Sequence, residues 1–582
     1  MSGLHGELLT DFARLEALAD EWERLRLQDP RREVFQRFAW VRAVWRAFGP
    51  RRRLCTPVVY RGTTPVAILP LMLEGGIIRF LTMPGADYND LLAASDAGPE
   101  VLALALGVLD TFPEPWRMCR LENLPEHARL LRFADGLTSG FRPRLHRRFS
   151  AACPTVVLGE ERVDLLRSIA QKKDLKRKEK NLRKRGEVRL RQVEDTREVL
   201  DHLPRFFEQH RLRRALTSEP SQFERGEQEA FYQALVEEMP KETLRFSILE
   251  LEGQPIAYHF GFEDNGKLIY YKPTFDVDLW DYSPGLILIL RLLDYASQAG
   301  LDELDFAGGL GDHKSRFANL TRTNLELMFA PRNLPGRVRL ALAQAREGLK
   351  QSQPGLFAQI KAASERIAAR GTLALAADFV RGLWGAVHQR EEVLIFARER
   401  SASTPACPFE LEAVALSAVA HIASQRDDMG EDDLRRVRER TRLGDRIYVA
   451  RRDGEATHVF LLGTRREFSA GGENGDEPRV TPTEPVSLIE QAWTARTRRG
   501  EGVPASLLAC LAQVAPSEHR EVWITCSSAD AASAASITAA GFLLRHRLGR
   551  ERWFRRPPRT WSVGKQQVES GASGPPQPDA TR

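Results

Sequence analysis

The sequence has few sulfur-containing residues: six cysteines and seven methionines in 582 residues. The cysteines lie far apart and none forms a C-x-x-C pair, so neither a zinc site nor a disulfide framework is expected. No apolar run reaches the ~18 residues of a membrane span, and the N-terminus lacks a basic segment followed by an apolar core. We therefore expect a cytoplasmic chain with no bound metal and no transmembrane segment.

The chain also has little net charge, because its formal net charge is only +6. A pI of 9.0 is compatible with an anionic ligand but does not require a nucleic acid. The content of 42% apolar and 28% charged residues is typical of soluble globular proteins. A chain of 582 residues is long enough for three or four domains, each with its own core.

Residues 268–318 form the most informative stretch. The β-prone run 268–274 precedes a polar loop, and the apolar run 286–296 predicts a buried helix that Gly300 ends. A short strand at 303–306 follows and leads into a glycine-rich loop. The order strand, loop, helix, strand predicts a parallel strand pair joined by a crossover helix.

The start of this helix is a candidate anion site. Ser283 is placed to cap the helix, Pro284 suits the first helical position, and Gly285 follows. Free N–H groups and the helix dipole favour an anion there, such as a pyrophosphate or a carboxylate. An ordinary capped core helix is the alternative interpretation.

Three patterns in this stretch carry a resemblance to a known family. They are Y-Y-K-x-x-F-D at 270–276, Y-S-P-G-L at 282–286 and D-F-x-G-G-x-x-D-x-K-x-x-F at 305–317. In this order they resemble the BioF-like or CelD-type acetyltransferases of the GNAT superfamily, which are similar to FemAB-like double-GNAT proteins. The resemblance extends over residues 35–331. It implies an α/β (α+β) fold of tandem GNAT-like domains with mixed central sheets.

The resemblance also implies an activity. Acetyl-CoA, or another acyl-CoA, would donate an acyl group to an amine or hydroxyl of a small-molecule or sugar acceptor, in envelope or exopolysaccharide biosynthesis. Ser283 and Gly285 would then contact the cofactor, and Tyr271, His259 and Asp305 are candidates for proton transfer. Buried aromatic and histidine residues on central strands are commonly plain core residues, which is the alternative for these three.

Lys314 follows the glycine loop, where FemAB-like proteins place a lysine near the acyl donor. An ordinary surface lysine is the alternative.

A second strand, loop, helix, strand pattern occupies the C-terminal part, at 486–526. Its R-R-G-E-G segment resembles the GNAT pyrophosphate loop, so Arg498, Arg499, Gly500 and Gly502 are candidate cofactor ligands. Thr497 stands where a glutamine or arginine is usual, and Ile537 where many GNAT enzymes have a tyrosine acid.

The expected domains are 1–150, 151–332 and 391–560, with a helical connector at 333–390 and a disordered tail at 561–582.

Residues 172–191 are strongly basic, with eleven lysines or arginines and three acids. They predict either a solvated helix or a surface for a polyanion. Two further functions are alternatives to acyl transfer from acyl-CoA. One is FemAB-like transfer from aminoacyl-tRNA, which the absence of a long helical arm disfavours, and the other is a non-catalytic GNAT-shaped scaffold. The sequence does not identify the acceptor or the oligomeric state.

Overall fold

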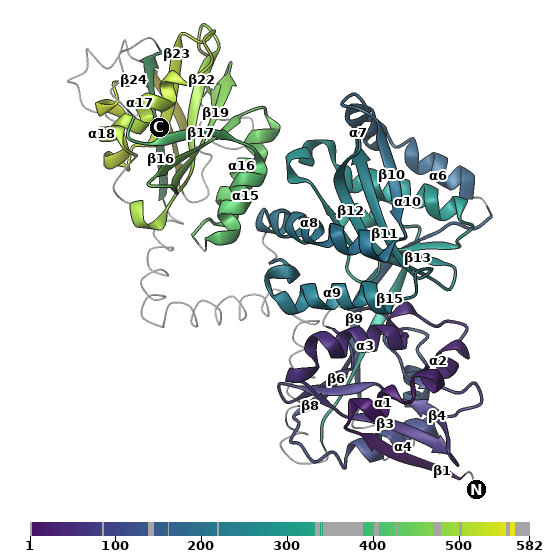
Figure 1. Ribbon diagram of the computed structural model, residues 1–582. Helices are drawn as coiled ribbons and strands as arrows, with labels where there is room; N and C mark the ends of the chain where they lie inside the picture. Colours follow the sequence, from purple (N-terminus) through teal and green to yellow (C-terminus); the bar gives the residue numbers. More distant parts are fainter. Residues whose placement is uncertain are drawn as a thin grey trace, which may run out of the picture. The chain divides into compact units, whose positions relative to one another are not determined.

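A computed structural model describes residues 3–83, 86–137, 145–160, 162–217, 220–331, 338, 340–341, 388–400, 407–426, 428–469, 479–499, 503–553 and 559–564. The chain divides into two compact units (Figure 1). Unit 1 comprises Met1–Arg213 with Pro220–Ala358, and unit 2 comprises Arg214–Glu219 with Gln359–Arg582. Most of the predicted connector at 333–390 and of the predicted tail lies outside the described residues.

Unit 1 consists of two halves. Strands β1 (Leu4–Leu9), β3 (Thr56–Arg61), β4 (Thr64–Ile68) and β7 (Leu92–Ala93) form a four-stranded sheet in the first half, in the order β1-β3-β4-β7. Its helices are α1 (Phe12–Glu16), α2 (Ala19–Leu27), α3 (Phe38–Phe48), α4 (Glu100–Leu109) and α5 (Arg129–Asp135). The apolar side chains of α3 recur at helical spacing and are buried, as the sequence predicts.

An eleven-stranded sheet runs through both halves. Its order is β10 (Val188–Val193), β11 (Leu244–Leu251), β12 (Gln254–Asp264), β13 (Lys267–Phe275), β14 (Glu303–Asp305), β9 (His146–Val157), β15 (Leu320–Phe329), β8 (Met118–Pro125), β6 (Ile77–Phe80), β5 (Leu71–Glu74) and β2 (Arg53–Leu54). Two neighbouring pairs are parallel, β13 with β14 and β6 with β8, and the others are antiparallel. Each half therefore contains one parallel pair.

The second half contributes α6 (Arg162–Ala170), α7 (Lys173–Arg183), α8 (Thr196–Ala215), α9 (Gly226–Glu238), α10 (Pro284–Gln298) and α11 (Asp312–Ser315). Helix α10 is the predicted crossover between the parallel strands β13 and β14, which confirms that prediction. It ends at Gln298, and Gly300 follows with φ of 72°, a conformation that glycine adopts without strain.

The two halves share a core. Helices α3 and α9 lie side by side (Figure 1), and the Trp40 and Phe231 rings meet edge to face with centroids 5.2 Å apart. Arg42 and Arg46 on α3 form ion pairs with Glu238 on α9, at 3.0 Å and 2.8 Å. Buried residues from both halves belong to one apolar cluster, so the halves are expected to unfold together.

Unit 2 contains an eight-stranded sheet in the order β17 (Glu410–Val414), β18 (Arg446–Arg452), β19 (Glu455–Arg465), β22 (Val486–Thr494), β23 (Glu521–Ser527), β16 (His388–Glu399), β24 (Leu543–Trp553) and β25 (Arg559–Gly564). Its helices include α15 (Leu416–Gln425), α16 (Glu431–Arg442), α17 (Ala505–Gln513) and α18 (Ala531–Ala539). The parallel pair β22 and β23 is connected through α17, as the sequence predicts.

One local prediction needs correction. The basic stretch 172–191 is not one solvated helix, because α7 ends at Arg183, Val188–Val193 is strand β10, and Leu175 and Leu182 are buried. The four residues 87–90 are all buried despite three polar side chains among them. Among the described residues, no helix is both long and apolar enough to cross a membrane.

Candidate active site

A β-bulge interrupts the pairing of β12 with β13, next to the point where β13 and β14 stop pairing. Phe260 on β12 lies opposite Lys272, whereas Phe262 lies opposite Ile269, so two residues of β13 face the single residue Gly261. A bulge of this kind bends its strand. Ile269 is also the last residue of β13 that pairs with β14, and β13 continues to Phe275 without β14 beside it.

Gly261 is required at the bulge. A Cβ atom there would lie 2.4 Å from the carbonyl oxygen of Ile269, which is much closer than van der Waals contact allows. An isolated glycine inside a β-prone run is a signal for a bulge or for a close backbone approach, but the sequence does not tell which of the two applies.

The first turn of α10 follows the opening. Ser283 precedes it with φ of 54°, and Pro284 and Gly285 begin the helix. The Ser283 hydroxyl does not cap the helix, contrary to the prediction; instead it accepts a hydrogen bond from Nζ of Lys178 at 2.6 Å. The N–H groups of Leu286 and Ile287 donate to the Ser283 carbonyl oxygen, at 3.0 Å and 3.3 Å, and Pro284 has no N–H. The Gly285 N–H is therefore the first-turn amide that suits an anion.

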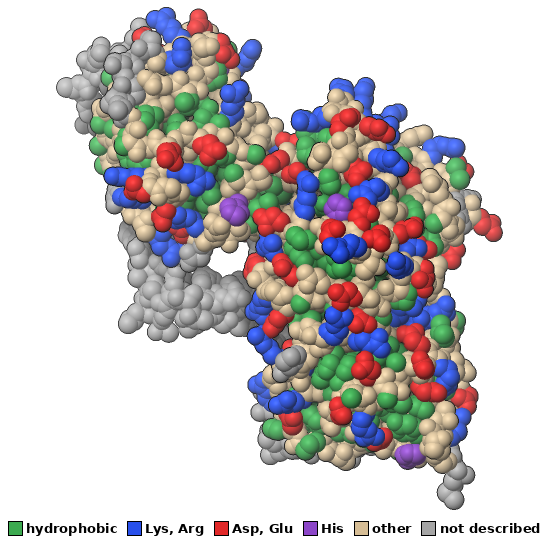
Figure 2. All heavy atoms as spheres, in the orientation of Figure 1, with side chains coloured by type: hydrophobic (Ala, Val, Ile, Leu, Met, Phe, Trp, Pro, Cys, Tyr) green, Lys and Arg blue, Asp and Glu red, His purple; other side chains and the backbone are tan. Residues whose placement is uncertain are grey.

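Helix α7 places positive charge beside this turn. Leu175 and Leu182 belong to the same apolar cluster as α10, and Arg291 on α10 forms an ion pair with Glu179 on α7. Lysine and arginine side chains gather on the surface over α7 (Figure 2). The basic stretch is therefore packed against α10, and its charges add to the positive end of the α10 dipole.

The glycine loop after β14 is held by two of the predicted residues. The Asp305 carboxylate is buried and accepts hydrogen bonds from the Tyr88 hydroxyl at 2.7 Å and from the Ala307 N–H at 2.8 Å. Burial raises the pKa of Asp305. Nζ of Lys314 donates to the carbonyl oxygens of Phe306 and Gly308, at 2.9 Å and 3.0 Å, so Lys314 is not an ordinary surface lysine.

Asp87 comes from the first half and reaches this loop. It is 8% exposed, and its carboxylate accepts a hydrogen bond from the Gly308 N–H. A Cβ atom on Gly308 would lie 2.5 Å from Oδ1 of Asp87, so this close approach depends on glycine. Burial raises the pKa of Asp87 to about 6, against the opposing effect of the Lys272 and Lys314 charges.

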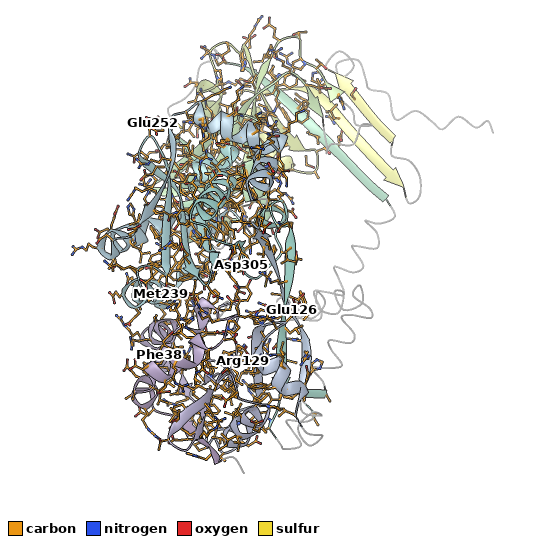
Figure 3. The ribbon with its side chains drawn as sticks, turned by 90° about the vertical axis from the view of Figure 1, so that its right-hand side faces the viewer. Phe38, Glu126, Arg129, Met239, Glu252 and Asp305 are labelled. Carbon is orange, nitrogen blue, oxygen red and sulfur yellow. The ribbon has the colours of Figure 1, made fainter. Side chains whose placement is uncertain are left out.

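Asp87 and its neighbour Tyr88 were not among the predicted site residues. The neighbouring Asp305 lies in the middle of unit 1 in Figure 3, with Phe38 and Arg129 on one side and Glu252 on the other. The only available signal was a tyrosine and two aspartates packed into four residues, next to an apolar run. That signal does not reveal a partner more than two hundred residues away.

Tyr271 and His259 are enclosed in the core. Burial raises the pKa of Tyr271 well above its usual value, and its hydroxyl donates to Sδ of Met83 at 3.6 Å. His259 stacks on Tyr270 with ring centroids 5.1 Å apart, and burial lowers its pKa to about 3, so it is neutral at physiological pH. Both arrangements suit packing residues, and a role in proton transfer stays a prediction for each.

The predicted cofactor loop of unit 2 is only partly described, since Gly500 and Gly502 lie outside the described residues. Arg498 ends a short 3-10 helix. The Arg499 guanidinium donates to the carbonyl oxygens of Thr494, at 3.1 Å, and of Asp428, at 2.5 Å. These contacts link Arg499 to the end of β22 and leave its role toward a phosphate untested.

Comparison with known proteins identifies the domain type. Residues 170–315 match the family described as "Acetyltransferase (GNAT) domain". This range includes the bulge, the first turn of α10, the glycine loop and Lys314. No curated protein matches the chain.

Several solved structures are similar in fold. A structure titled "Crystal structure of FemX" is 11% identical with a TM-score of 0.38, covering 54% of this chain and 96% of that chain. A tandem GNAT protein from the clavulanic acid biosynthesis pathway is 14% identical with a TM-score of 0.35, covering 56% and 98%. The C-terminal domain of a putative lysylphosphatidylglycerol synthetase from Agrobacterium fabrum is 11% identical with a TM-score of 0.36, covering 56% and 96%.

The predicted fold class is confirmed in its general form: the described residues form mixed sheets flanked by helices, and residues 170–315 match a GNAT acetyltransferase domain. The matched domain type is an acetyltransferase domain, which supports acyl transfer as the general chemistry. The narrower BioF-like or CelD-type assignment stays a prediction.

Proposed function

We propose that the protein is an acyltransferase that binds acyl-CoA, such as acetyl-CoA, in the opening between β13 and β14. The observation that carries the proposal is that the matched acetyltransferase range contains the bulge, the α10 turn and the glycine loop together. The acyl group passes to an amine or hydroxyl, and a sugar precursor of the envelope or of an exopolysaccharide is the proposed acceptor.

The CoA pyrophosphate would bind at the first turn of α10. The Gly285 N–H and the helix dipole favour its negative charge, and Lys178 provides a cation next to Ser283. Residues 270–275 of β13 lie beyond the end of β14, so their backbone can pair with the amides of the CoA arm as a strand would.

Asp87 is the proposed general base. Its ionised carboxylate removes the proton from the acceptor nitrogen or oxygen as this atom attacks the thioester carbonyl. The tetrahedral intermediate then collapses, the carbon–sulfur bond breaks, and the CoA thiolate leaves and takes up a proton. Asp305 and Lys314 fix the loop that donates the Gly308 N–H to Asp87, so we assign them as positioning residues.

Replacing Lys178 by methionine should weaken acetyl-CoA binding by about tenfold or more, because one charge-assisted contact contributes about 1.5–3 kcal/mol. Lys180→Met on the same helix is the matched control and should change the affinity much less, since Lys180 has no contact with Ser283 among the described residues. Isothermal titration measures both. Equal losses in the two variants would show that only the net charge of α7 matters.

Two other functions are distinguished by one experiment. A FemAB-like transferase would bind tRNA through the basic face of α7, and a scaffold protein would bind neither donor. Thermal-shift measurements with acetyl-CoA, longer acyl-CoAs and tRNA should show stabilisation by an acyl-CoA. Stabilisation by tRNA alone would favour the FemAB-like reaction, and no stabilisation by any of them would favour the scaffold.

The loop containing Arg498, Arg499, Gly500 and Gly502 is proposed as a second acyl-CoA site, on the basis of its resemblance to the GNAT pyrophosphate loop. Ile537, at the position of the usual tyrosine acid, is 2% exposed and lies in the core of unit 2. Binding without independent catalysis is therefore the expected behaviour of unit 2.

A further inference from the structure

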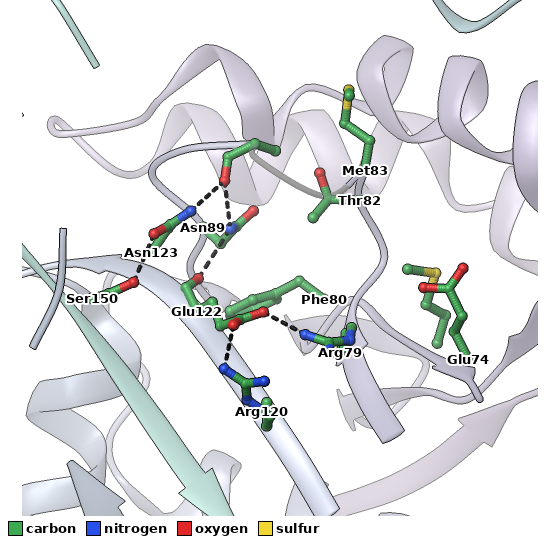
Figure 4. A pocket seen from close by; sticks show the side chains of 12 residues that line it. Glu74, Arg79, Phe80, Thr82, Met83, Asn89, Arg120, Glu122, Asn123 and Ser150 are labelled. Atoms are coloured by element: carbon green, nitrogen blue, oxygen red, sulfur yellow. Dashed lines mark hydrogen bonds and ion pairs between the residues drawn. The ribbon is translucent and has the colours of Figure 1, made fainter. Parts of the chain in front are cut away.

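The first half of unit 1 contains a cavity of about 420 Å³ (Figure 4). The parallel pairing of β6 with β8 ends at Ile78 and Cys119, and the cavity lies just beyond, between Arg79 on β6 and Glu122 on β8. This is the same position, relative to a parallel pair, as the opening between β13 and β14 in the second half. A volume of this size falls in the range of small-molecule sites.

The charges that line the cavity balance one another. Glu122 forms ion pairs with Arg79 and with Arg120, at 2.5 Å and 2.6 Å. The other lining carboxylate, Glu74, accepts a hydrogen bond from Arg52 at 3.1 Å. An incoming phosphate or carboxylate would have to compete with Glu122 for the arginines, so a strongly anionic ligand is disfavoured.

Neutral hydrogen-bonding groups complete the lining. The Ser150 hydroxyl donates to Oδ1 of Asn123 at 2.8 Å, and Nδ2 of Asn123 donates to the Ala86 carbonyl at 2.8 Å, as Figure 4 shows. Asn89 is fixed by the Glu122 carbonyl. The Phe80 ring and methionine side chains provide an apolar wall.

Such a lining suits hydroxyl groups. A guanidinium paired with a carboxylate offers a donor and an acceptor side by side, and a ligand hydroxyl can use either. A polyhydroxylated ligand also replaces the water of a polar cavity while reproducing its hydrogen bonds. From the balanced charges, the fixed amides and the apolar wall, we propose that this cavity binds a neutral ligand of the sugar class.

The loop that lines the cavity also carries Asp87. Ala86 and Asn89 face the cavity, while the side chains of Asp87 and Tyr88 bind Gly308 and Asp305 in the second half. A ligand in the cavity therefore contacts the segment that delivers the proposed base. The binding site itself rests on the cavity alone and not on acyl-CoA binding in the second half.

The test is ligand binding by the full chain. The probes are neutral mono- and disaccharides, including glucose, galactose and N-acetylglucosamine with their β-linked disaccharides, and they are compared with inorganic phosphate and glutamate. Saturation-transfer NMR identifies a bound saccharide, and isothermal titration gives its Kd. Saturable binding of at least one neutral saccharide is expected, with weaker or no binding of phosphate and glutamate.

Variants of the cavity residues test whether the saccharide binds in this cavity. Arg79→Met should raise the Kd of the bound saccharide tenfold or more, and Ser150→Ala, a small change on β9, should raise it severalfold. Arg53→Met is the control, because it removes the same charge from the exposed Arg53 of nearby β2, outside the cavity. Thermal unfolding of each variant verifies its fold.

The proposal is overturned if no neutral saccharide binds saturably at millimolar concentration or if phosphate or glutamate binds more tightly than every saccharide. It is equally overturned if folded Arg79→Met and Ser150→Ala both bind as the unaltered chain does. Acetyl-CoA titration is run separately, so a failure of saccharide binding is distinguishable from a failure of the proposed acyltransferase function.

Discussion

Asp87→Asn is expected to lower kcat for acyl transfer by about 10²–10⁴-fold, the range that a positioned general base contributes. The amide of asparagine fills the same space beside Gly308 but cannot take up the acceptor's proton. The Kd of acetyl-CoA should stay unchanged, because Asp87 contacts the glycine loop and not the first turn of α10. Steady-state kinetics with acetyl-CoA and a screened amine or sugar acceptor measures the effect.

The pH dependence gives a second readout of the same residue. Burial raises the pKa of Asp87 to about 6, and the base acts only when ionised. The rate should therefore rise as the pH increases through about 6 and level off above it. In Asp87→Asn this rise should be absent from the residual rate.

Asp90→Asn is the matched control, since it makes the same substitution in the same loop. The Asp90 carboxylate accepts backbone hydrogen bonds from Arg129 and Leu130, at 2.6 Å and 2.9 Å, so its loss should lower the melting temperature. The folded fraction should keep the pH profile of the unaltered protein. A normal rate and pH profile in Asp87→Asn would refute the assignment of Asp87 as base.

Ser283→Asp is expected to weaken acetyl-CoA binding by tenfold or more while leaving the melting temperature unchanged or higher. Aspartate tolerates the positive φ of 54° at this position, and a carboxylate at a helix N-terminus is stabilising. The same carboxylate takes the place proposed for the pyrophosphate and occupies Lys178. Isothermal titration and thermal unfolding together separate loss of binding from loss of fold.

Ser283→Asn is the control for this substitution. Asparagine has nearly the same shape as aspartate and also tolerates positive φ, but it carries no charge. It should change the affinity only slightly. If aspartate and asparagine weaken binding equally, the effect is steric and the pyrophosphate does not lie at this turn; if neither weakens it, the donor binds elsewhere.

Local sequence patterns predicted the main strands and the crossover helix of the second half of unit 1. The apolar run at 286–296, Pro284 and Gly300 define a helix with a clear start and end, and β13, α10 and β14 follow as expected. These elements could be predicted from the sequence because each depends on residues that are close together in it. The same reasoning predicted β22, α17 and β23 in unit 2.

The contacts that build the candidate site depend on distant residues. Tyr88 and Asp305 are 217 positions apart, and nothing in either segment points to the other. The bulge opposite Gly261 depends on the register between β12 and β13, which an alternating pattern does not fix to a single residue. The prediction that Ser283 caps the helix was wrong. The backbone at Ser283 is left-handed, and a serine in the sequence does not indicate this conformation.

A crystal structure of the full chain with bound CoA is the most direct test of the central claim, that residues 170–315 hold the acyl donor. The pyrophosphate should lie at the first turn of α10, against the Gly285 N–H and beside Ser283 and Lys178, with the CoA arm along residues 270–275 of β13. A pyrophosphate bound only before α17 in unit 2, with the first turn of α10 empty, would contradict the claim.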